Sequence, residues 1–366
     1  MSEWLNPSTS AYRLTDLGWS TEHDHQFLPY RGTHVPARVA RVERGGVDVL
    51  GAAGTLHVTY GGSVLAAAAA DHTQHPAAGD WVAIARWPDG RLTLEAILPR
   101  RTVLTRDSSN RTSHGQVVAA NVDLVVIVEH LDPDSDLGRI ERLLVLAWSS
   151  GATPLVVLTK ADLVPDPERM REEVVAVAPG VDVLAVDATA DDGATALRQR
   201  LGPDVTMTFV GPSGAGKSTL VNAIAGANVM ATNEVRGRDG KGRHTTTHRE
   251  LVVVPGHGVV IDTPGLRAVG LIADPDDIAD AFPDIDELAG ECRFRDCAHE
   301  AEPGCAVLAA AGDGELDKDR LARWRKLRRE AAYQARRADA RLRREELARS
   351  KRRAKALRQH YRARGR

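Results

Sequence analysis

The chain has 366 residues, of which 43% are hydrophobic and 27% charged, as expected for a globular protein of two or three domains. The first ten residues, MSEWLNPSTS, lack the apolar core of a secretory signal. The apolar stretch at 64–70 is far shorter than a membrane span. We therefore expect a cytoplasmic protein without a membrane segment.

The net charge of −2 hides an asymmetry between the body of the chain and its C-terminal tail. Residues 318–366 contain 21 Lys and Arg against 5 Asp and Glu, whereas residues 1–317 contain 27 against 45. The tail thus carries +16 and the body −18. This pattern indicates a polyanionic partner, and it favours nucleic acid over the alternative of a solvated charged helix.

The N-terminal part is predicted to be an irregular segment, 1–32, followed by a β-rich domain at 33–112. Alternating segments such as GTLHVTY are typical of half-buried strands. Five short strands without a long helix favour a small β-barrel of the OB-fold type, which often binds RNA. Tyr60, Trp81 and Trp87 are candidates for stacking on bases, and core packing is the alternative for each.

From 113 to 272 the pattern changes to apolar strands that alternate with helices, which predicts an α/β domain with a parallel sheet covered on both faces. The expected strands are 121–128, 153–160, 181–186, 205–210, 250–255 and 258–263, and the expected helices are 137–149, 167–177 and 193–201. Short helices are expected at 273–320, and a basic helical tail at 321–366.

A phosphate-binding loop follows the strand at 205–210. It matches G-x-x-x-x-G-K-[ST] in full, and a helical segment comes after it. Its glycines let backbone N–H groups face phosphates, and the helix N-terminus adds its positive dipole end. Lys217 is expected to reach the β- and γ-phosphates, and Ser218 to ligate Mg²⁺. The predicted nucleotide-binding residues of this loop are Gly211, Pro212, Ser213, Gly214, Ala215, Gly216, Lys217, Ser218 and Thr219.

Two further segments have the features of γ-phosphate sensors. Asp262 ends an expected strand in the sequence DTPG, where its carboxylate can hold Mg²⁺ through water and the N–H of Gly265 can face the γ-phosphate. The polar, glycine-rich stretch 226–249 is typical of a mobile switch loop. We choose Thr246 from its three consecutive threonines as the Mg²⁺ ligand; a plain surface loop is the alternative.

Thr159-Lys160-Ala161-Asp162 has the form of a guanine-specificity loop. Asp162 can accept hydrogen bonds from the ring N–H and exocyclic amine of guanine, which adenine cannot supply, and Lys160 would lie along the base. This loop precedes the phosphate loop by 49 residues, the reverse of the usual order. In an open α/β sheet ligands bind at the carboxyl ends of strands, so the motifs can still meet. The sequence therefore predicts a circularly permuted GTPase; a P-loop ATPase or kinase with an accidental TKAD is the alternative.

The three cysteines fall within 14 residues, in the pattern Cys292, Cys297, His299, Cys305. An odd number of cysteines argues against a disulfide framework. Three thiolates and one imidazole predict a tetrahedral Zn²⁺ site, one per chain, and it should be structural because no position stays open for substrate. Buried free thiols beside an unrelated histidine are the alternative, and the filled ligand set disfavours a zinc enzyme.

In combination, these motifs resemble the ribosome small subunit-dependent GTPase A family, also called RsgA or YjeQ, over nearly the whole chain. The resemblance is carried by a β-barrel, TKAD before GPSGAGKST, then GRHTTT, DTPG and CRFRDCAHEAEPGC. It implies an OB domain, a permuted GTPase core and a zinc-binding helical domain. It also implies a role in late maturation of the small (30S) ribosomal subunit, with rRNA, GTP and GDP as partners and hydrolysis stimulated by the subunit. We expect a monomer.

The chain departs from the family pattern at two places. Thr159 stands where the family usually has Asn, which predicts somewhat weaker guanine selectivity. The arginine-rich tail is longer than the family pattern requires, which predicts extra RNA affinity through phosphate contacts.

Hydrolysis is expected to be slow without a partner. Leu266 stands where many small GTPases place a Gln that orients water. His244 is a candidate for positioning that water, and a structural or RNA-contacting role is its alternative. The competing function for the whole chain is an RNA-binding scaffold with little hydrolysis.

Overall fold

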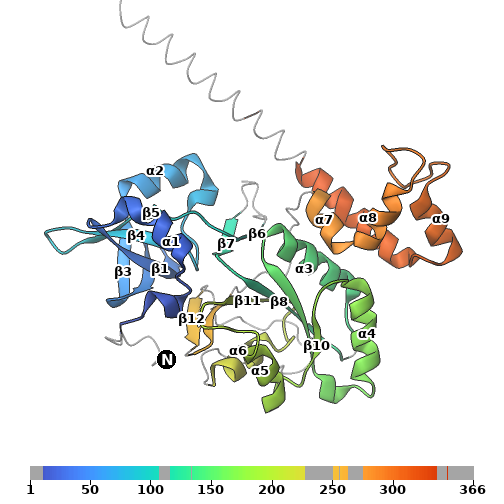
Figure 1. Cartoon of the computed structure of the whole chain (residues 1–366), viewed down its shortest axis with the longest axis horizontal. Helices are drawn as coiled ribbons and strands as arrows, with labels where there is room; N and C mark the ends of the chain where they lie inside the picture. The colour runs from blue at the N-terminus through green and yellow to red at the C-terminus, as the bar shows by residue number, and fades with distance from the viewer. Residues whose placement is uncertain are drawn as a thin grey trace, which may run out of the picture.

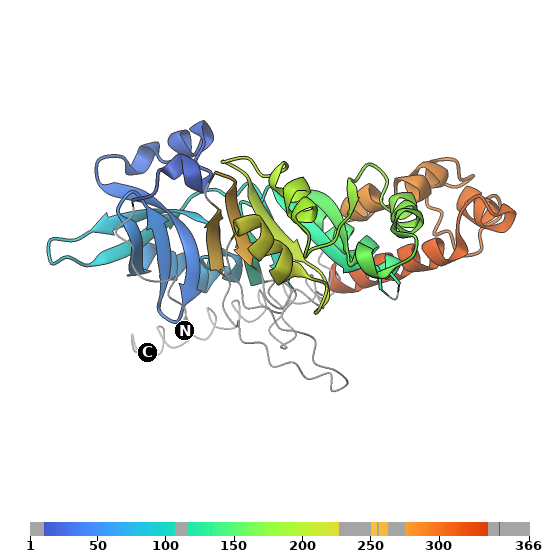
Figure 2. The ribbon, with the colours of Figure 1, turned by 90° about the horizontal axis from the view of Figure 1, so that it is seen from below.

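The computed structural model describes residues 11–106, 116–132, 134–226, 250–254, 256–262, 275–335 and 344. The predicted roles of His244, Thr246, Gly265 and Leu266 lie outside these residues, as does most of the tail. Within them the molecule has three parts in a row: a β-barrel, a central sheet with helices, and a helical unit at the far end (Figures 1 and 2).

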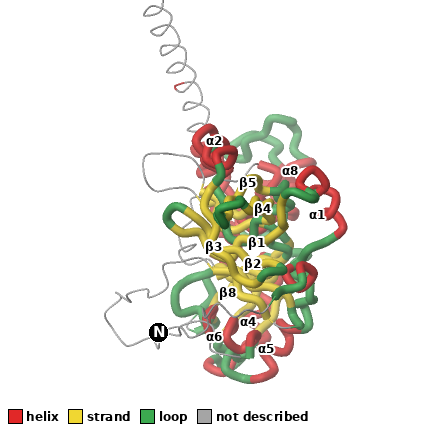
Figure 3. The backbone as a smooth tube through the Cα atoms, turned by 90° about the vertical axis from the view of Figure 1, so that its left-hand side faces the viewer, coloured by secondary structure: helices red, strands yellow, loops and turns green. Residues whose placement is uncertain are grey.

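The barrel confirms the predicted OB-like architecture. Its strands are β1 (His34–Glu43), β2 (Gly46–Gly51), β3 (Gly54–Tyr60), β4 (Trp81–Arg86) and β5 (Leu92–Ile97). They pair in the order β1-β2-β3-β5-β4, and β4 pairs back to β1, which closes the barrel. Helix α2 (Gly62–Ala70) and the short η4 (His72–Gln74) connect β3 to β4. Seen from the barrel end, these strands lie in front of the central sheet (Figure 3).

The N-terminal segment was predicted to be irregular, but residues 14–30 form three short helical turns. These are η2 (Leu14–Leu17), α1 (Thr21–Gln26) and η3 (Leu28–Tyr30). Their apolar residues pack on the barrel. For example, the rings of Trp19 and Trp81 meet edge to face, with 4.8 Å between the ring centroids. Trp81 is only 1% exposed and belongs to the core, whereas Trp87 is 45% exposed.

The buried guanidinium of Arg38 joins the N-terminal segment, the barrel and the central domain. It donates to the carbonyl oxygens of Leu17, Gly79 (3.1 Å) and Asn121 (3.0 Å). Burial lowers the pKa of Arg38 to about 10, so it stays charged at neutral pH. Three backbone acceptors satisfy a cation that would otherwise be costly to bury.

The central sheet continues from the barrel. Its strands are β8 (Leu124–His130), β9 (Thr153–Thr159), β10 (Val183–Ala185), β11 (Thr206–Val210), β12 (Glu250–Val254) and β13 (Gly258–Asp262), in the order β10-β9-β8-β11-β13-β12. The prediction of a wholly parallel sheet was wrong for β12, which runs antiparallel to β13. Only three residues separate these two strands, and so short a link permits a hairpin but no crossover. β12 also pairs with β1 at Glu250 and Arg41.

Helices cover both faces of this sheet, as predicted. They are α3 (Leu137–Ser149), α4 (Pro167–Val177), α5 (Asp191–Arg198) and α6 (Lys217–Ala225), with the short turn η5 (Ala161–Leu163). Alternate residues of β8 enter two different cores: Val125 and Ile127 pack with α3 and α4, whereas Val126 and Val128 pack with α5 and α6. The continuous apolar run of β8 therefore reflects burial on both faces.

Two smaller units complete the described chain. A hairpin pairs β6 (Val103–Arg106) with β7 (Gln116–Ala120) across the predicted boundary at 112; the domain boundaries themselves stay predictions. The far end holds α7 (Pro275–Ala281), α8 (Pro283–Gly290), α9 (Ala306–Asp313) and a helix at 318–335, with α7 beside α3 (Figure 1). Across the described ranges, no helix combines the length and apolar character that crossing a membrane requires.

Candidate nucleotide and metal sites

The phosphate-loop sequence forms a tight turn between β11 and α6. Gly211 has φ 138°, and a Cβ built there would lie 2.0 Å from the carbonyl oxygen of Val128 on β8. Only glycine fits this approach. Gly216, at φ 83°, precedes the first residue of α6, so the helix N-terminus opens onto the loop.

Lys217 lies at that N-terminus and folds over the loop. Its ammonium donates to the carbonyl oxygens of Gly211 at 2.9 Å and Pro212 at 2.5 Å. The ammonium group is therefore held against the first two residues of the loop. Ser218 and Thr219 are half-buried in the first turn of α6.

The Thr159–Asp162 loop contacts the phosphate loop directly, despite the reversed order in the chain. The Thr159 hydroxyl lies 2.9 Å from the carbonyl oxygen of Ala215 and 3.2 Å from that of Glu129. Thr159 is fully buried, while Lys160 adopts a left-handed conformation at φ 60° that turns the chain outward. Asp162 is exposed beyond this turn. The two loops thus touch each other through Thr159 and Ala215.

Sheet order explains this meeting. β8 lies between β9, which ends in Thr159, and β11, which ends at the phosphate loop. β13 pairs with β11 on the other side, and the register puts the half-buried Asp262 at the same edge of the sheet. All three predicted motifs therefore lie at the carboxyl ends of parallel strands, at one edge of the sheet.

Three residues at this edge were missed from the sequence. Glu129 and His130 end β8, between the two loops, and Arg139 on α3 approaches both Glu129 oxygens at 3.2 Å. Burial raises the pKa of the fully buried Glu129, while Arg139 opposes that rise. Burial and then the charge of Lys160 lower the pKa of His130. The only sequence signal was a carboxylate at the end of an apolar strand.

The segment after β10 was also missed. The carbonyl of Val186 accepts a hydrogen bond from the N–H of Ala161 at 3.3 Å, so this segment adjoins the guanine loop. Asp187 accepts from the N–H and hydroxyl of Thr189 at 2.8 and 2.6 Å, which folds residues 187–190 into a turn. This turn therefore lies beside the Thr159–Asp162 loop.

The four predicted zinc ligands lie together, with their ligand atoms all within 4.8 Å of one another. Cys292 Sγ is 3.8 Å from Cys305 Sγ and 3.5 Å from His299 Nδ1, and Cys305 Sγ is 3.4 Å from the same Nδ1. Two thiolates bound to tetrahedral Zn²⁺ at about 2.3 Å are about 3.8 Å apart. The donor set and its spacing therefore fit zinc.

Surrounding residues hold this cluster in shape. Glu302 accepts hydrogen bonds from the N–H groups of Ala298, Glu300 and Ala301 at 2.8–3.0 Å, which closes the loop that presents His299. The N–H of Glu302 itself, and then those of Glu300 and Ala301, lower the pKa of Glu302 to about 2. The His299 ring also packs edge-on against Trp324, at 5.6 Å.

Comparisons with known sequences agree with this geometry. A family model described as RsgA GTPase matches residues 97–272. The chain is 47% identical to the small ribosomal subunit biogenesis GTPase RsgA of Streptomyces avermitilis, over 92% of this chain and 91% of the relative. It is 42% identical to the small ribosomal subunit biogenesis GTPase RsgA of Opitutus terrae, over 96% of this chain and 99% of the relative. An ABC transporter model matches residues 195–358, which include the phosphate loop but not Thr159–Asp162.

Two solved structures have a fold similar to that of this chain. YjeQ from Thermotoga maritima superposes with a TM-score of 0.61 and 25% identity, covering 82% of this chain and 99% of that one. YloQ, described as a circularly permuted GTPase, superposes with a TM-score of 0.59 and 26% identity. The match covers 83% of this chain and 96% of that one.

Proposed function

The chain belongs to the RsgA family of small ribosomal subunit biogenesis GTPases, and we propose that one guanine nucleotide binds across its two adjoining loops. It hydrolyses GTP to GDP and phosphate. The observation that carries the proposed pocket is the contact between Thr159 and Ala215, because it joins the base-reading loop to the phosphate loop.

The residues divide the nucleotide between them. Backbone N–H groups of residues 211–216 hold the phosphates, and Lys217 exchanges its loop carbonyls for phosphate oxygens. Asp162 accepts the two hydrogen bonds that identify guanine. Ser218 and Asp262 are the described residues assigned to Mg²⁺, which when bound neutralises charge on the β- and γ-phosphates. Thr246 and Gly265 stay predictions.

Slow hydrolysis without the ribosomal subunit is part of the proposal. With leucine at position 266, no glutamine orients the attacking water there. The small subunit then accelerates the reaction by ordering the loops or by adding a group. His244 keeps its predicted role as a candidate for positioning water.

The remaining parts provide binding and stability. We assign Zn²⁺ at Cys292, Cys297, His299 and Cys305 a structural role, because four protein ligands leave no open position. The barrel and the basic tail are proposed to contact rRNA, through phosphates in the case of the tail. The protein is proposed to act as a cytoplasmic monomer.

The decisive experiment measures phosphate release from GTP by the full chain, with and without purified small subunits. We expect little release alone and strong stimulation by subunits. If phosphate release is absent under both conditions, the alternative of an RNA-binding scaffold is favoured.

A competition experiment tests which nucleotide binds. We expect unlabelled GDP, but not ATP, to displace labelled GTP from the chain. Equal displacement by ATP would favour the alternative of a P-loop ATPase or kinase.

Asp162→Asn provides a test of the base-reading residue. An amide donates where guanine also donates, so GDP affinity should fall by about 100-fold or more. Xanthosine diphosphate has a carbonyl at that position and should bind the variant better than GDP. Unchanged preference for GDP would remove Asp162 from the pocket.

A further inference from the structure

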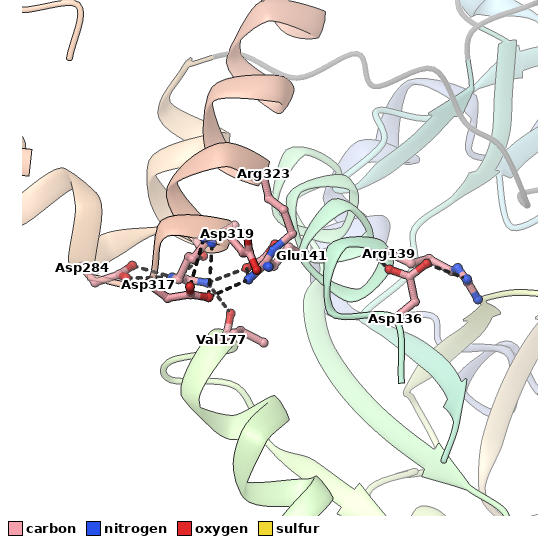
Figure 4. A network of polar contacts seen from close by, with 10 residues as sticks. Asp136, Arg139, Glu141, Val177, Asp284, Asp317, Asp319 and Arg323 are labelled. Atoms are coloured by element: carbon pink, nitrogen blue, oxygen red, sulfur yellow. Dashed lines mark hydrogen bonds and ion pairs between the residues drawn. The ribbon is translucent and has the colours of Figure 1, made fainter. Parts of the chain in front are cut away.

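Helix α3 carries functional charges on two opposite sides. Arg139 and Glu141 are two residues apart, which is about 200° around a helix, so their side chains point in opposite directions. Arg139 reaches the nucleotide edge of the sheet, whereas Glu141 faces the C-terminal helices (Figure 4). A single rigid helix thus connects two regions that the sequence places far apart.

On the first side, Arg139 neutralises a buried carboxylate beneath the nucleotide loops. Its Nη1 lies 3.2 Å from each oxygen of Glu129, and its Nη2 donates to Asp136 at 2.7 Å. Glu129 is fully buried, and its own carbonyl is an acceptor for Thr159. An unpaired negative charge here would repel a nucleotide polyanion with little screening.

On the second side, two arginines of the helix at 318–335 enclose the fully buried Glu141. Arg320 donates to it at 2.8 Å, and Arg323 donates to it at 2.5 and 3.2 Å. Arg320 also forms two 2.7 Å bonds to Asp284 on α8, and it reaches the carbonyl of Val177 at 3.1 Å. This network fixes α3 to the helical unit.

The network is costly to break from one side. Glu141 is 0% exposed and Arg320 is 4% exposed, so removing one partner leaves the other charge buried. A second ion pair, Arg142 with Glu330 at 2.5 Å, ties the next residue of α3 to the same C-terminal helix. The position of α3 therefore depends on where that helix docks.

We propose that Arg139 is a positioning residue of the nucleotide site, and that the C-terminal helix holds it there through Glu141. When the helix at 318–335 shifts, Glu129 loses its counterion and nucleotide affinity falls. A partner that engages this basic helix thereby gains control over nucleotide release. The inference rests on the proposed binding of GTP and GDP to this site.

The first test compares dissociation constants of fluorescent GDP for the full chain and four variants. Arg139→Gln should raise Kd about tenfold, because Glu129 then keeps, among the described residues, only the N–H of His130 as a hydrogen-bond partner and its negative charge has no arginine beside it. The titration is done at about pH 8, since burial raises the pKa of Glu129 and a protonated Glu129 would carry no charge. Arg139→Lys should recover most of that loss, and Glu129→Gln should bind at least as tightly as the parent. The double variant Glu129→Gln/Arg139→Gln should return to within about twofold of the parent, whereas a purely structural role predicts additive losses.

The second test asks whether the effect passes through α3. Arg323→Gln, which leaves the Arg320 contact in place, should raise Kd about threefold in the parent and not at all in the Glu129→Gln background. Equal effects in both backgrounds would overturn the coupling. Arg171→Gln breaks an exposed pair with Glu168 on α4 and serves as the matched control.

The outcomes separate the two proposals. If the parent chain fails to bind fluorescent GDP, the proposed function fails. If the parent binds but Arg139→Gln binds equally well, or the double variant stays as weak as Arg139→Gln, only the present inference fails.

Discussion

The hydroxyl of Thr159 lies 2.9 Å from the carbonyl oxygen of Ala215, a residue 56 positions later in the chain. This contact joins the guanine loop to the phosphate loop in a core whose motifs are encoded in reversed order. A hydroxyl has one proton, so Thr159 can donate to Ala215 or to Glu129 but not to both at once. Nucleotide binding should therefore depend on this single buried hydroxyl.

Thr159→Val removes the hydroxyl and keeps the shape of the side chain. Because the buried carbonyl of Ala215 loses its donor, we expect Kd for GDP and GTP to rise about fivefold, equivalent to about 1 kcal/mol. Titration with a fluorescent nucleotide measures this change. Thr159→Ser retains the hydroxyl and is the control; equal losses in Val and Ser variants would show that packing, not the hydrogen bond, matters.

Gly211→Ala should abolish nucleotide binding. The new Cβ would lie 2.0 Å from the Val128 carbonyl oxygen, and β8 is buried on both faces and cannot move aside. We expect Kd to rise more than about 100-fold. Gly180→Ala is the control: it has φ 73° with no atom within 4 Å of the new Cβ, so it adds backbone strain without a clash. Normal binding by Gly211→Ala would contradict the geometry of the loop.

The sequence predicted those parts of the fold whose signals are local. The helices at 137–149 and 167–177 have the predicted bounds, because Asp136 and Asp166 cap their first turns and apolar residues recur on one face. The glycine pattern at 211–216 was equally local. The direction of β12 was missed although the sequence contained its signal: the expected strands at 250–255 and 258–263 leave two residues between them, too few for a parallel crossover.

Long-range charge partners were beyond the sequence. Glu141 pairs with Arg320, 179 residues later, and in sequence it looks like an ordinary exposed position of an amphipathic helix. Arg38 on β1 is likewise a charged residue that the sequence did not single out, yet it is only 1% exposed. The burial and the partners of such residues can be identified only in the folded structure, where the three parts of the chain are in contact.

Removing Cys305, which we propose as a zinc ligand, should unfold the end of the molecule that holds it. Its sulfur also accepts the N–H of Leu308 at the start of α9. For Cys305→Ser we expect loss of one bound zinc per chain and a fall in Tm of the C-terminal unit on the order of 10 °C. Metal analysis and calorimetry on the full chain test this, with exposed His25→Ala as control. Full zinc content in the serine variant would contradict the assigned ligand set.

Buried His23 should make stability depend on pH. It is 0% exposed and packs between Trp19 and Trp81. Burial first, then the charges of Arg101 and Arg38, lower its pKa from 6.5 to about 4. The unfolded chain therefore binds the proton more readily, so this contribution is complete above pH 6.5 and is lost as pH falls toward 4.

Between pH 6.5 and pH 4, the lowered pKa of His23 should change the free energy of unfolding by on the order of 3 kcal/mol. His23→Leu cannot take up a proton, so the parent should lose stability relative to the variant as the pH falls from 7 to 4.5. Urea unfolding of both proteins at several pH values measures it. The variant also loses the bond from the N–H of Ser20 to the ring, but that loss is the same at every pH at which the ring is neutral. Parallel stability curves for parent and variant would show that His23 titrates normally in the folded state.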